Sequence, residues 1–304
     1  MANVRTLRKQ SSDGDENVDR GQLILVTGFA IAVVLLALVL LLNTAIYTEN
    51  IATRSTADDT REAVEIHATV ESTAASYIER KNEAIAEDNS AHSRADAESD
   101  FVSLRDPHEE RSLRQGQSLS IDYLSQTNGT KVTSVDEGQL TSSTDPVEIV
   151  NATSETRSFQ LRLTDLPSES EQTRVLIEDT ETVSISEINL YQNGAGEFVV
   201  ESDGEVCTTS ASEPVLDISA GVFSGEECTV QWPAVGTHSI SIVNGSATTG
   251  ELSFVTHESG DTNTTDDRIS TSDAIYSINT SVTYVTDQLE YATEIRVAPG
   301  EPDV

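Results

Sequence analysis

The sequence predicts an α+β protein, in which a long N-terminal transmembrane and stalk helix precedes an antiparallel β-rich, sandwich-like extracellular domain. Residues 23–42 form an uncharged apolar run, residues 48–106 keep a helical spacing of apolar positions, and apolar and polar residues alternate from about Ser118 onward. We therefore expect a cytoplasmic leader at 1–21, a transmembrane helix at 22–47, a stalk helix at 48–106, a β-rich domain at 107–299 and a tail at 300–304.

The apolar run has the length of a membrane span. Only Thr27 and Gly28 interrupt its apolar character, and twenty residues at a rise of 1.5 Å span about 30 Å, the thickness of the hydrocarbon core. The apolar region of a cleaved secretion signal is shorter, about 7 to 15 residues, and ends in a site of small residues. Tyr47 follows at the position of an interfacial aromatic residue. We expect a helix that stays in the lipid.

The basic residues predict how this helix is oriented. Four precede the span and two follow it closely, which places the N-terminus in the cytoplasm and the C-terminal part outside: Arg5, Arg8, Lys9 and Arg20 against Arg54 and Arg61. Five N-glycosylation sequons agree with an external C-terminal part, although a chain rich in Ser and Thr contains some by chance. Their asparagines are Asn128, Asn151, Asn244, Asn263 and Asn279.

The stalk helix carries one narrow apolar stripe. Its members recur at spacings of three, four and seven residues: Ile66, Val70, Ala74, Tyr77 with Ile78, and Ile85. The first proline after residue 48 is in the pair Asp106-Pro107, which predicts the end of the helix. The stripe needs a partner, and its spacing fits the distal domain and a neighbouring subunit equally well.

Short strands separated by turn residues fill the second half. Asn193-Gly194 predicts a hairpin between two alternating runs, residues 258–272 predict an exposed loop, and Asp287-Gln288 joins the last hairpin. The residues that we expect on the buried face of this last hairpin are Val282, Tyr284, Tyr291, Ile295 and Val297. Strands of this length and spacing favour an antiparallel sandwich.

The chain is strongly acidic. It has 52 acidic and 18 basic residues, a formal net charge of −34, and only three lysines, Lys9, Lys81 and Lys131. Molar salt shortens the Debye length to about 3 Å and screens such repulsion, so the composition resembles that of proteins from extreme halophiles. Charge-driven disorder is the alternative, and the recurrent apolar strands argue against it. No basic patch is present to neutralise phosphates, so nucleic acid is not expected as a partner.

Cys207 and Cys228 are the two cysteines of the chain. Outside the membrane an even pair that closes a loop of about twenty residues favours a disulfide, which contributes about 3 kcal/mol in the chain-entropy model. Free thiols and a metal site are the alternatives. A metal site is disfavoured because neither cysteine has a second Cys or a His at ligand spacing.

No arrangement of residues predicts catalysis, a cofactor or a metal. The histidines are His67, His92, His108, His238 and His257, and none belongs to a nucleophile elbow or a zinc motif. We expect Asp266 and Asp267 on a solvated face, because they match no complete calcium loop, and Trp232 in a packing role.

The N-terminal segment resembles a class of surface-filament subunits. A charged leader ending in Arg20-Gly21, then Gln22 and an uninterrupted apolar helix, resembles the class III signal of type IV pilins and archaellins. The resemblance implies that a prepilin peptidase cleaves between Gly21 and Gln22 and leaves the helix on the mature protein. Val26 occupies the fifth mature position, where bacterial pilins usually carry a glutamate, and archaeal relatives often lack that residue. A plain single-span anchor is the alternative.

Both ends of the chain resemble one haloarchaeal membrane-protein family that accompanies pilin-type genes. The two stretches are RGQLILVTGFAIAVVLLALVLLLNTAIYTENIATR and VTYVTDQLEYATEIRVAPGEPDV. The resemblance implies a minor pilin-like structural subunit without enzymatic activity, whose partners are membrane lipid, other pilin-like subunits and the prepilin peptidase. The alternative is a monomeric membrane-anchored binding or adhesion module with an uncleaved N-terminus; a cell-surface enzyme has no support in the sequence.

Overall fold

The computed structural model describes residues 15–88, 94–135, 138–181, 184–230, 237–257, 261–262 and 266–302. The chain divides into two compact units, Met1–Arg61 and Glu62–Val304, and each is described here by itself. The predicted fold class is confirmed, because an N-terminal apolar helix is followed by a domain built mainly of antiparallel sheet.

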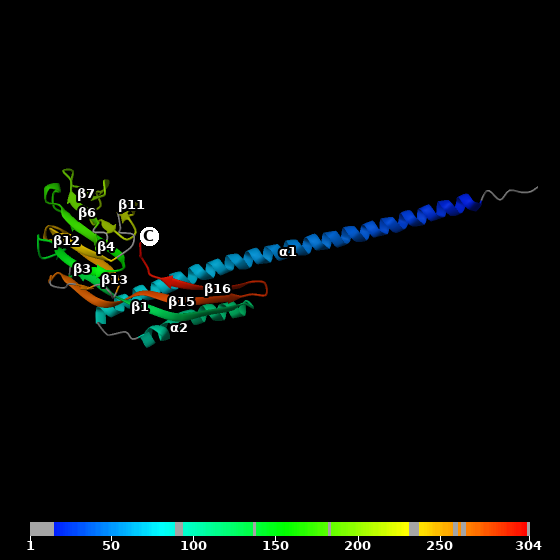
Figure 1. Ribbon diagram of the computed structural model, residues 1–304, viewed down its shortest axis with the longest axis horizontal. Helices are drawn as coiled ribbons and strands as arrows, with labels where there is room; N and C mark the ends of the chain where they lie inside the picture. Colours follow the sequence, from blue (N-terminus) through cyan, green and yellow to red (C-terminus); the bar gives the residue numbers. More distant parts are fainter. Residues whose placement is uncertain are drawn as a thin grey trace, which may run out of the picture. The chain divides into compact units, whose positions relative to one another are not determined.

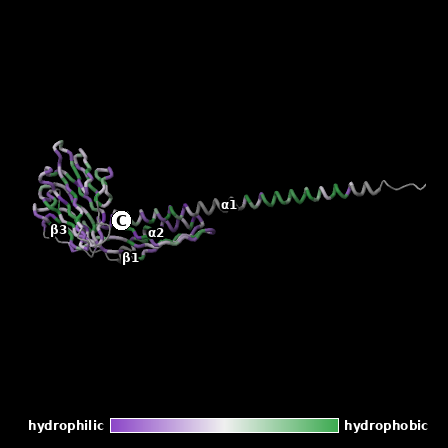
Figure 2. Tube along the Cα trace, turned by 45° about the horizontal axis from the view of Figure 1, so that its top comes forward, coloured by the Kyte–Doolittle hydropathy of each residue, from purple (hydrophilic) through white to green (hydrophobic). Residues whose placement is uncertain are grey.

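The described part of the first unit is helical throughout. It is the first portion of α1 (Asp15–Asp88), and its apolar residues appear as the long green run of that helix in Figure 2. The remainder of α1, residues 62–88, belongs to the second unit, together with α2 (Arg94–Arg114) and all the strands.

The prediction of a single stalk helix over 48–106 is wrong after Asp88. The first helix ends at Asp88, and α2 is a separate helix that contains Pro107, the residue expected to end the stalk. Pro107 is exposed, while Phe101 of the same helix is 3% exposed and packs in the core. Packing of this buried face outweighs the cost of an internal proline, about 3 kcal/mol.

Gly116 ends α2 instead. Its φ is +81°, and its backbone N–H donates to the carbonyl of Leu113 at 3.1 Å, while the N–H of Gln117 donates to that of Ser112 at 3.0 Å. A left-handed residue after the last turn lets the free carbonyls of a helix end find donors, and glycine adopts that conformation without a side-chain clash.

Nine of the described strands form the first sheet, in the order β11-β10-β9-β4-β13-β1-β15-β16, with β2 paired to β13. All its neighbouring pairs are antiparallel. The strands are β1 (Ser118–Ser134), β2 (Gly138–Gln139), β4 (Thr156–Asp165), β9 (Val215–Asp217), β10 (Val222–Phe223), β11 (Glu226–Glu227), β13 (Thr249–His257), β15 (Ile269–Val285) and β16 (Glu290–Val297).

Seven of the described strands form the second sheet, in the order β14-β3-β12-β5-β6-β7-β8. They are β3 (Val147–Thr153), β5 (Thr173–Asp179), β6 (Ile185–Gln192), β7 (Phe198–Ser202), β8 (Glu205–Thr209), β12 (His238–Val243) and β14 (Asp261–Thr262). Two short 3₁₀ turns, Glu169–Glu171 and Gly245–Ala247, lie in the connections between strands.

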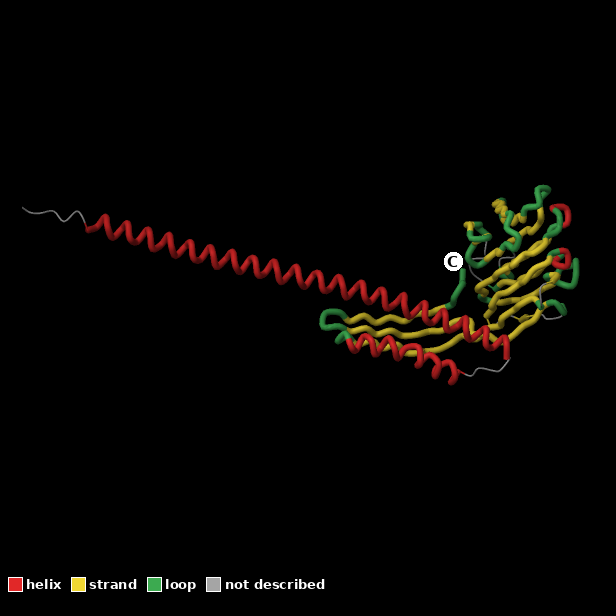
Figure 3. The backbone as a smooth tube through the Cα atoms, turned by 180° about the vertical axis from the view of Figure 1, so that it is seen from behind, coloured by secondary structure: helices red, strands yellow, loops and turns green. Residues whose placement is uncertain are grey.

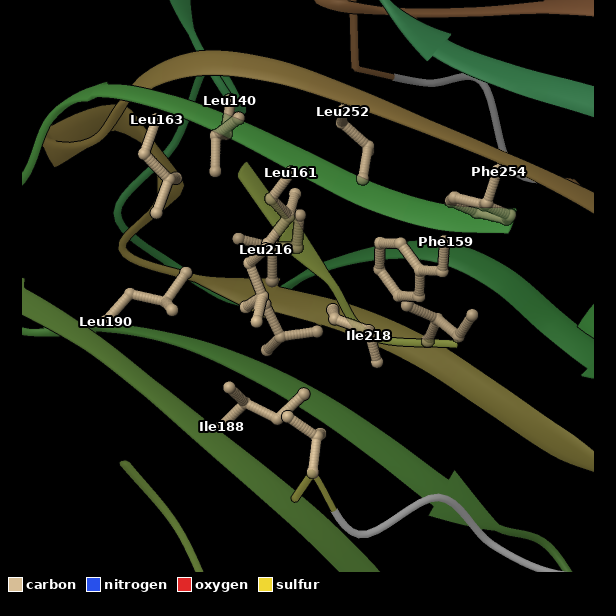
Figure 4. Close-up of a cluster of buried hydrophobic side chains, with 14 of the residues drawn as sticks. Leu140, Phe159, Leu161, Leu163, Ile188, Leu190, Leu216, Ile218, Leu252 and Phe254 are labelled. Atoms are coloured by element: carbon tan, nitrogen blue, oxygen red, sulfur yellow. The ribbon is translucent and has the colours of Figure 1, made fainter. Parts of the chain in front are cut away.

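The inner faces of the two sheets share one hydrophobic core. Figure 4 shows Leu161, Phe159 and Phe254 of the first sheet facing Ile188 and Leu190 of the second. These five side chains have no exposed surface, and the rings of Phe159 and Phe254 lie 4.9 Å apart. The alternating apolar residues of the sequence therefore build the expected sandwich.

A second core lies where the long strands run beyond the sandwich. There β1, β15 and β16 form a three-stranded extension, and α2 and residues 62–88 of α1 lie along it (Figures 1 and 3). The buried members of this core are Ala63, Val70, Ala74, Tyr77, Ile78, Phe101, Leu119, Ile121, Ile275, Ile278, Val282, Tyr284, Ile295 and Val297. The apolar stripe of the stalk thus packs against its own domain.

Two hairpins lie where the sequence predicts them. Asn193 opens the turn between β6 and β7, where its side-chain oxygen accepts hydrogen bonds from the N–H groups of Ala195 and Glu197. The last hairpin pairs β15 with β16, and the side chains expected to be buried are buried, except that Tyr291 is half-buried.

The expected exposed loop at 258–272 is wrong for most of its described residues. Asp261 and Thr262 form β14 and pair with β3, and β15 begins at Ile269, which is 6% exposed. Asp266 is 5% exposed, not solvated as expected: its carboxylate accepts hydrogen bonds from Ser142 and from the N–H of Arg268. A polar run can be buried where a carboxylate satisfies backbone donors.

Candidate functional site: the apolar segment of helix α1, and the sheet edge at Ile275

Residues Gly21–Tyr47 are a candidate membrane span, by their length and composition. The large apolar side chains of this segment are 48–73% exposed, so nothing in the described chain covers them. A helix that is apolar on every side requires an apolar environment, and 27 residues at 1.5 Å each give about 40 Å, enough to cross a bilayer. The segment suggests a membrane anchor.

The two threonine hydroxyl groups of this segment are compatible with lipid. Thr27 donates its hydroxyl hydrogen to the carbonyl of Leu23 at 2.7 Å, and Thr44 donates to that of Leu40 at 2.8 Å. A polar group in hydrocarbon needs an internal partner, because no water is there to bond it. Both residues therefore enter the span with their donors satisfied.

The expected cleavage boundary lies within α1. Gly21 and Gln22 are exposed, and a methyl group placed on Gly21 would meet nothing within 4 Å. The helix begins at Asp15, six residues earlier. Of the expected leader, residues 1–14 lie outside the described part, and so does the side chain of Arg20.

The end of α1 is held by a residue that the sequence did not single out. Asn82 is 5% exposed, its Nδ2 donates to the carbonyl of Ile275 at 3.0 Å, and its Oδ1 accepts from the N–H of Ile275 at 2.7 Å. Strand β16 pairs with β15 only from Ile278 to Val285, so none of the described strands pairs with Ile275 on that side. The side chain of Asn82 replaces that neighbour.

Arg157 supports the same edge from the sandwich. It lies on β4 and is 2% exposed; its guanidinium donates to the carbonyl of Ile275 at 2.9 Å and to the carbonyl of Pro299 at 2.8 Å. Burial lowers its pKa to about 10, against the opposing influence of Tyr276 and nearby carboxylates. The guanidinium stays charged at neutral pH and is held mainly by backbone carbonyls.

Gly300 and Glu301, the first residues of the predicted tail at 300–304, form hydrogen bonds with the domain. The N–H of Ser158 donates to the carbonyl of Gly300 at 2.7 Å, and Glu301 accepts hydrogen bonds from Tyr276 (2.9 Å) and Arg296. The carbonyl of Gly300 and the carboxylate of Glu301 thus each accept hydrogen bonds from the domain. Residues 303 and 304 lie outside the described part.

The charges of this cluster stabilise one another. Burial alone would raise the pKa of Glu301, but the hydrogen bonds from Arg296 and Tyr276 and the two nearby guanidinium groups lower it overall. The hydrogen bond to Glu301 raises the pKa of Arg296, and burial raises that of Tyr276. We call Arg157, Tyr276, Arg296 and Glu301 the C-terminal clasp.

Cys207 and Cys228 form a disulfide with an S–S distance of 2.00 Å. Cys207 lies on β8, at the edge of the second sheet, and Cys228 follows β11, at the edge of the first. The bond therefore connects the two sheets at one end of the sandwich, where β10 and β11 are only two residues long.

The sequons differ in what their asparagines contact. Asn128 and Asn151 are exposed on strands β1 and β3. Asn244 and Asn279 are half-buried, and each donates its side-chain nitrogen to a neighbour: Asn244 to the carbonyl of Glu171 and Asn279 to the hydroxyl of Ser125. Asn263 lies outside the described residues.

The four histidines in the described part of the chain do not lie together. His67 bonds Tyr291 at 3.1 Å, His238 is buried and bonds Thr156 at 3.0 Å, and His257 lies edge-on to Tyr276. His108 lies beside a small gap under α2, and His92 and Trp232 fall outside the described residues. In the part of the chain that the structure describes, no three His, Cys, Asp or Glu side chains are grouped so as to hold a metal ion.

Residues 17–141 match the "Family of unknown function (DUF7261)". The match covers less than half of the chain; it includes the apolar segment, both helices and β1, and leaves out most of the sandwich. No curated protein and no solved structure matches the chain. The family match therefore covers the candidate membrane span, the helical part of the second unit and strand β1.

Proposed function

We propose that this protein is a pilin-like structural protein of the cell surface, a minor subunit of a type IV pilus-like assembly. The observation that carries the proposal is the exposed apolar segment Gly21–Tyr47, which belongs to the same continuous helix, α1, as residues 62–88 of the folded domain. One helix that is both anchor and domain element suits a subunit that leaves the membrane while keeping its N-terminal helix.

The sequence before the span supports the same proposal. The polar leader ends in Arg20-Gly21, the pattern that resembles a prepilin-peptidase signal, and cleavage there would leave Gln22 as the first mature residue. Residues 22–47 would sit in lipid before assembly and pack against the same segment of other subunits afterwards. The small residues Gly28, Ala30 and Ala32 would permit close helix approach.

The domain is proposed to lie outside the cell, with the N-terminus in the cytoplasm. Basic residues are more frequent before the span than directly after it, and a disulfide persists in oxidising surroundings. The net charge of −34 suits a surface exposed to concentrated salt, as in haloarchaea. The sequons would then lie on the side where N-glycosylation takes place.

Two variants test the proposal in the native host. Gly21→Val places a branched side chain at the residue that the peptidase must accept, so we expect an uncleaved chain that stays in the membrane and is missing from sheared surface filaments. Leu36→Ile is the matched control within the same helix; it keeps the size and apolar character of the side chain, and it should be cleaved and incorporated as the wild type is. Equal recovery of both variants in filaments would contradict the proposal.

A monomeric anchored adhesion module predicts a different result. Its chain would keep residues 1–21, and neither the wild type nor the variants would appear in the filament fraction.

A further inference from the structure

Asn128 differs from Asn244 and Asn279 in that its side-chain nitrogen donates no hydrogen bond within the described residues. It lies on β1 where the pairing with β15 shifts register, between Thr127 and Asn128. Its side chain is exposed, and its oxygen accepts a hydrogen bond from Gln126 at 2.9 Å. Its Nδ2, the atom that takes a sugar, donates to no residue in the described part of the chain.

In Asn244 and Asn279 the side-chain nitrogen Nδ2 already donates a hydrogen bond to another residue. Nδ2 of Asn244 donates to the carbonyl of Glu171 at 2.6 Å, and the backbone of Asn244 is left-handed, with φ +59°. The next residue, Gly245, is so close to Thr141 that an added methyl group would lie 2.5 Å from its hydroxyl oxygen. Nδ2 of Asn279 donates to Ser125 at 3.1 Å. At either position a sugar would have to be attached to a nitrogen that already lies within hydrogen-bond distance of a protein oxygen.

Asn151 has an exposed side chain but a buried sequon hydroxyl. Thr153 has no exposed surface; its hydroxyl donates to the carbonyl of Glu155 at 2.9 Å and accepts from Thr256. A glycosyltransferase that must contact the hydroxyl of Thr153 cannot reach it in the folded domain. In the Asn128 sequon the hydroxyl residue is Thr130, which is half-buried. Gly129 separates it from Asn128.

We propose that Asn128 is an N-glycosylation site that remains open to modification in the folded domain. The donor class is an oligosaccharide linked through C1 to a lipid phosphate. Nδ2 of Asn128 forms a bond to C1 and loses one proton, and the bond from C1 to the lipid phosphate breaks, which releases the phosphate as the leaving group. The inference rests on the proposed function only in placing the domain on the external side.

Glycopeptide mass spectrometry of the full chain from native membranes tests this directly. We expect a glycan mass on the Asn128 peptide of the wild type and none on the Asn244 peptide. Asn128→Gln and Thr130→Ala should each remove that mass. Thr130→Ser keeps the hydroxyl and should retain it, and Asn244→Gln should leave the glycan content unchanged.

An unmodified Asn128 peptide in the wild type would overturn the proposal, as would a glycan found on Asn244 but not on Asn128. The same digest contains the N-terminal peptide, so one experiment tests the glycosylation of Asn128 and the proposed function independently. A chain that begins at Gln22 with a bare Asn128 rejects the glycosylation site and leaves the proposed function standing. A chain that keeps its leader and carries a glycan on Asn128 rejects the proposed function and leaves the glycosylation site standing.

Discussion

Asn82 pairs with the backbone of Ile275 through two hydrogen bonds, one to the carbonyl and one from the N–H, as a neighbouring strand would. Both residues are at most 5% exposed. The pair lies where β16 no longer accompanies β15, so the open edge of the sheet is closed by a side chain from the helix. This contact fixes where residues 62–88 of α1 sit on the domain.

Removing this side chain should destabilise the domain. Asn82→Ala leaves the N–H of Ile275 buried without its acceptor, which costs about 1–3 kcal/mol, while its carbonyl keeps the hydrogen bond from Arg157. We expect a loss in that range in denaturant unfolding of the full chain in detergent at molar salt. The control Glu83→Ala, at an exposed position of the same helix, should change the free energy of unfolding by less than about 0.5 kcal/mol. Equal effects of the two variants would refute the role of Asn82.

The C-terminal clasp should make stability depend on pH. The pKa of Glu301 is lower in the folded protein than in the unfolded chain, so its contribution is complete above the ordinary carboxyl pKa, about 4.3, and is lost as pH falls through the folded value. Because the group is partly solvated, we expect Glu301→Gln to cost about 1 kcal/mol at pH 7. Unfolding measured from pH 7 to 3 should show the difference from wild type shrinking; a constant difference would argue against this ion pair.

The disulfide should stabilise the sandwich mainly through the unfolded chain. Reduction, or the double variant Cys207→Ser with Cys228→Ser, removes a link across 21 positions and should cost about 3 kcal/mol. Thermal unfolding with and without reductant measures this. The reductant should lower the midpoint of the wild type to that of the double variant and leave the variant unchanged, and any effect on the variant would point to another cause.

Salt should stabilise the domain because it screens the net charge of −34. We expect the thermal midpoint to rise as potassium chloride increases from about 0.1 M to the molar range, where the Debye length falls to about 3 Å. Sucrose at matched osmolality is the control, since it favours compact states without screening charge. A midpoint that responds to sucrose and salt alike would show that screening is not the main effect.

Periodicity in the sequence predicts much of this fold. The stripe from Ile66 to Ile85, the hairpin at Asn193 and the last hairpin all follow from spacing and turn chemistry, because each depends on residues close in the chain. Pro107 misleads for the opposite reason: its local preference ends a helix, and the packing of Phe101 against distant strands keeps the helix going.

The hydrogen bonds of Asn82 and Arg157 to Ile275 and Pro299 could not be predicted from periodicity. Asn82 and Ile275 are 193 positions apart, Arg157 and Pro299 are 142 apart, and nothing in their immediate neighbours marks them. The one available signal was a basic residue, Arg157, inside an otherwise alternating strand, and that signal does not name its partners. Which polar residues close a sheet edge depends on where the strands end, and only the folded chain determines that.

The first residue of the mature protein tests the central proposal most directly. Mass spectrometry of the intact chain and of its N-terminal peptide, on material purified from native membranes, reads that residue. The account predicts a chain that begins at Gln22, with the apolar segment intact. A chain that retains Arg20 and the residues before it would contradict the pilin-like proposal and leave a membrane-anchored surface domain.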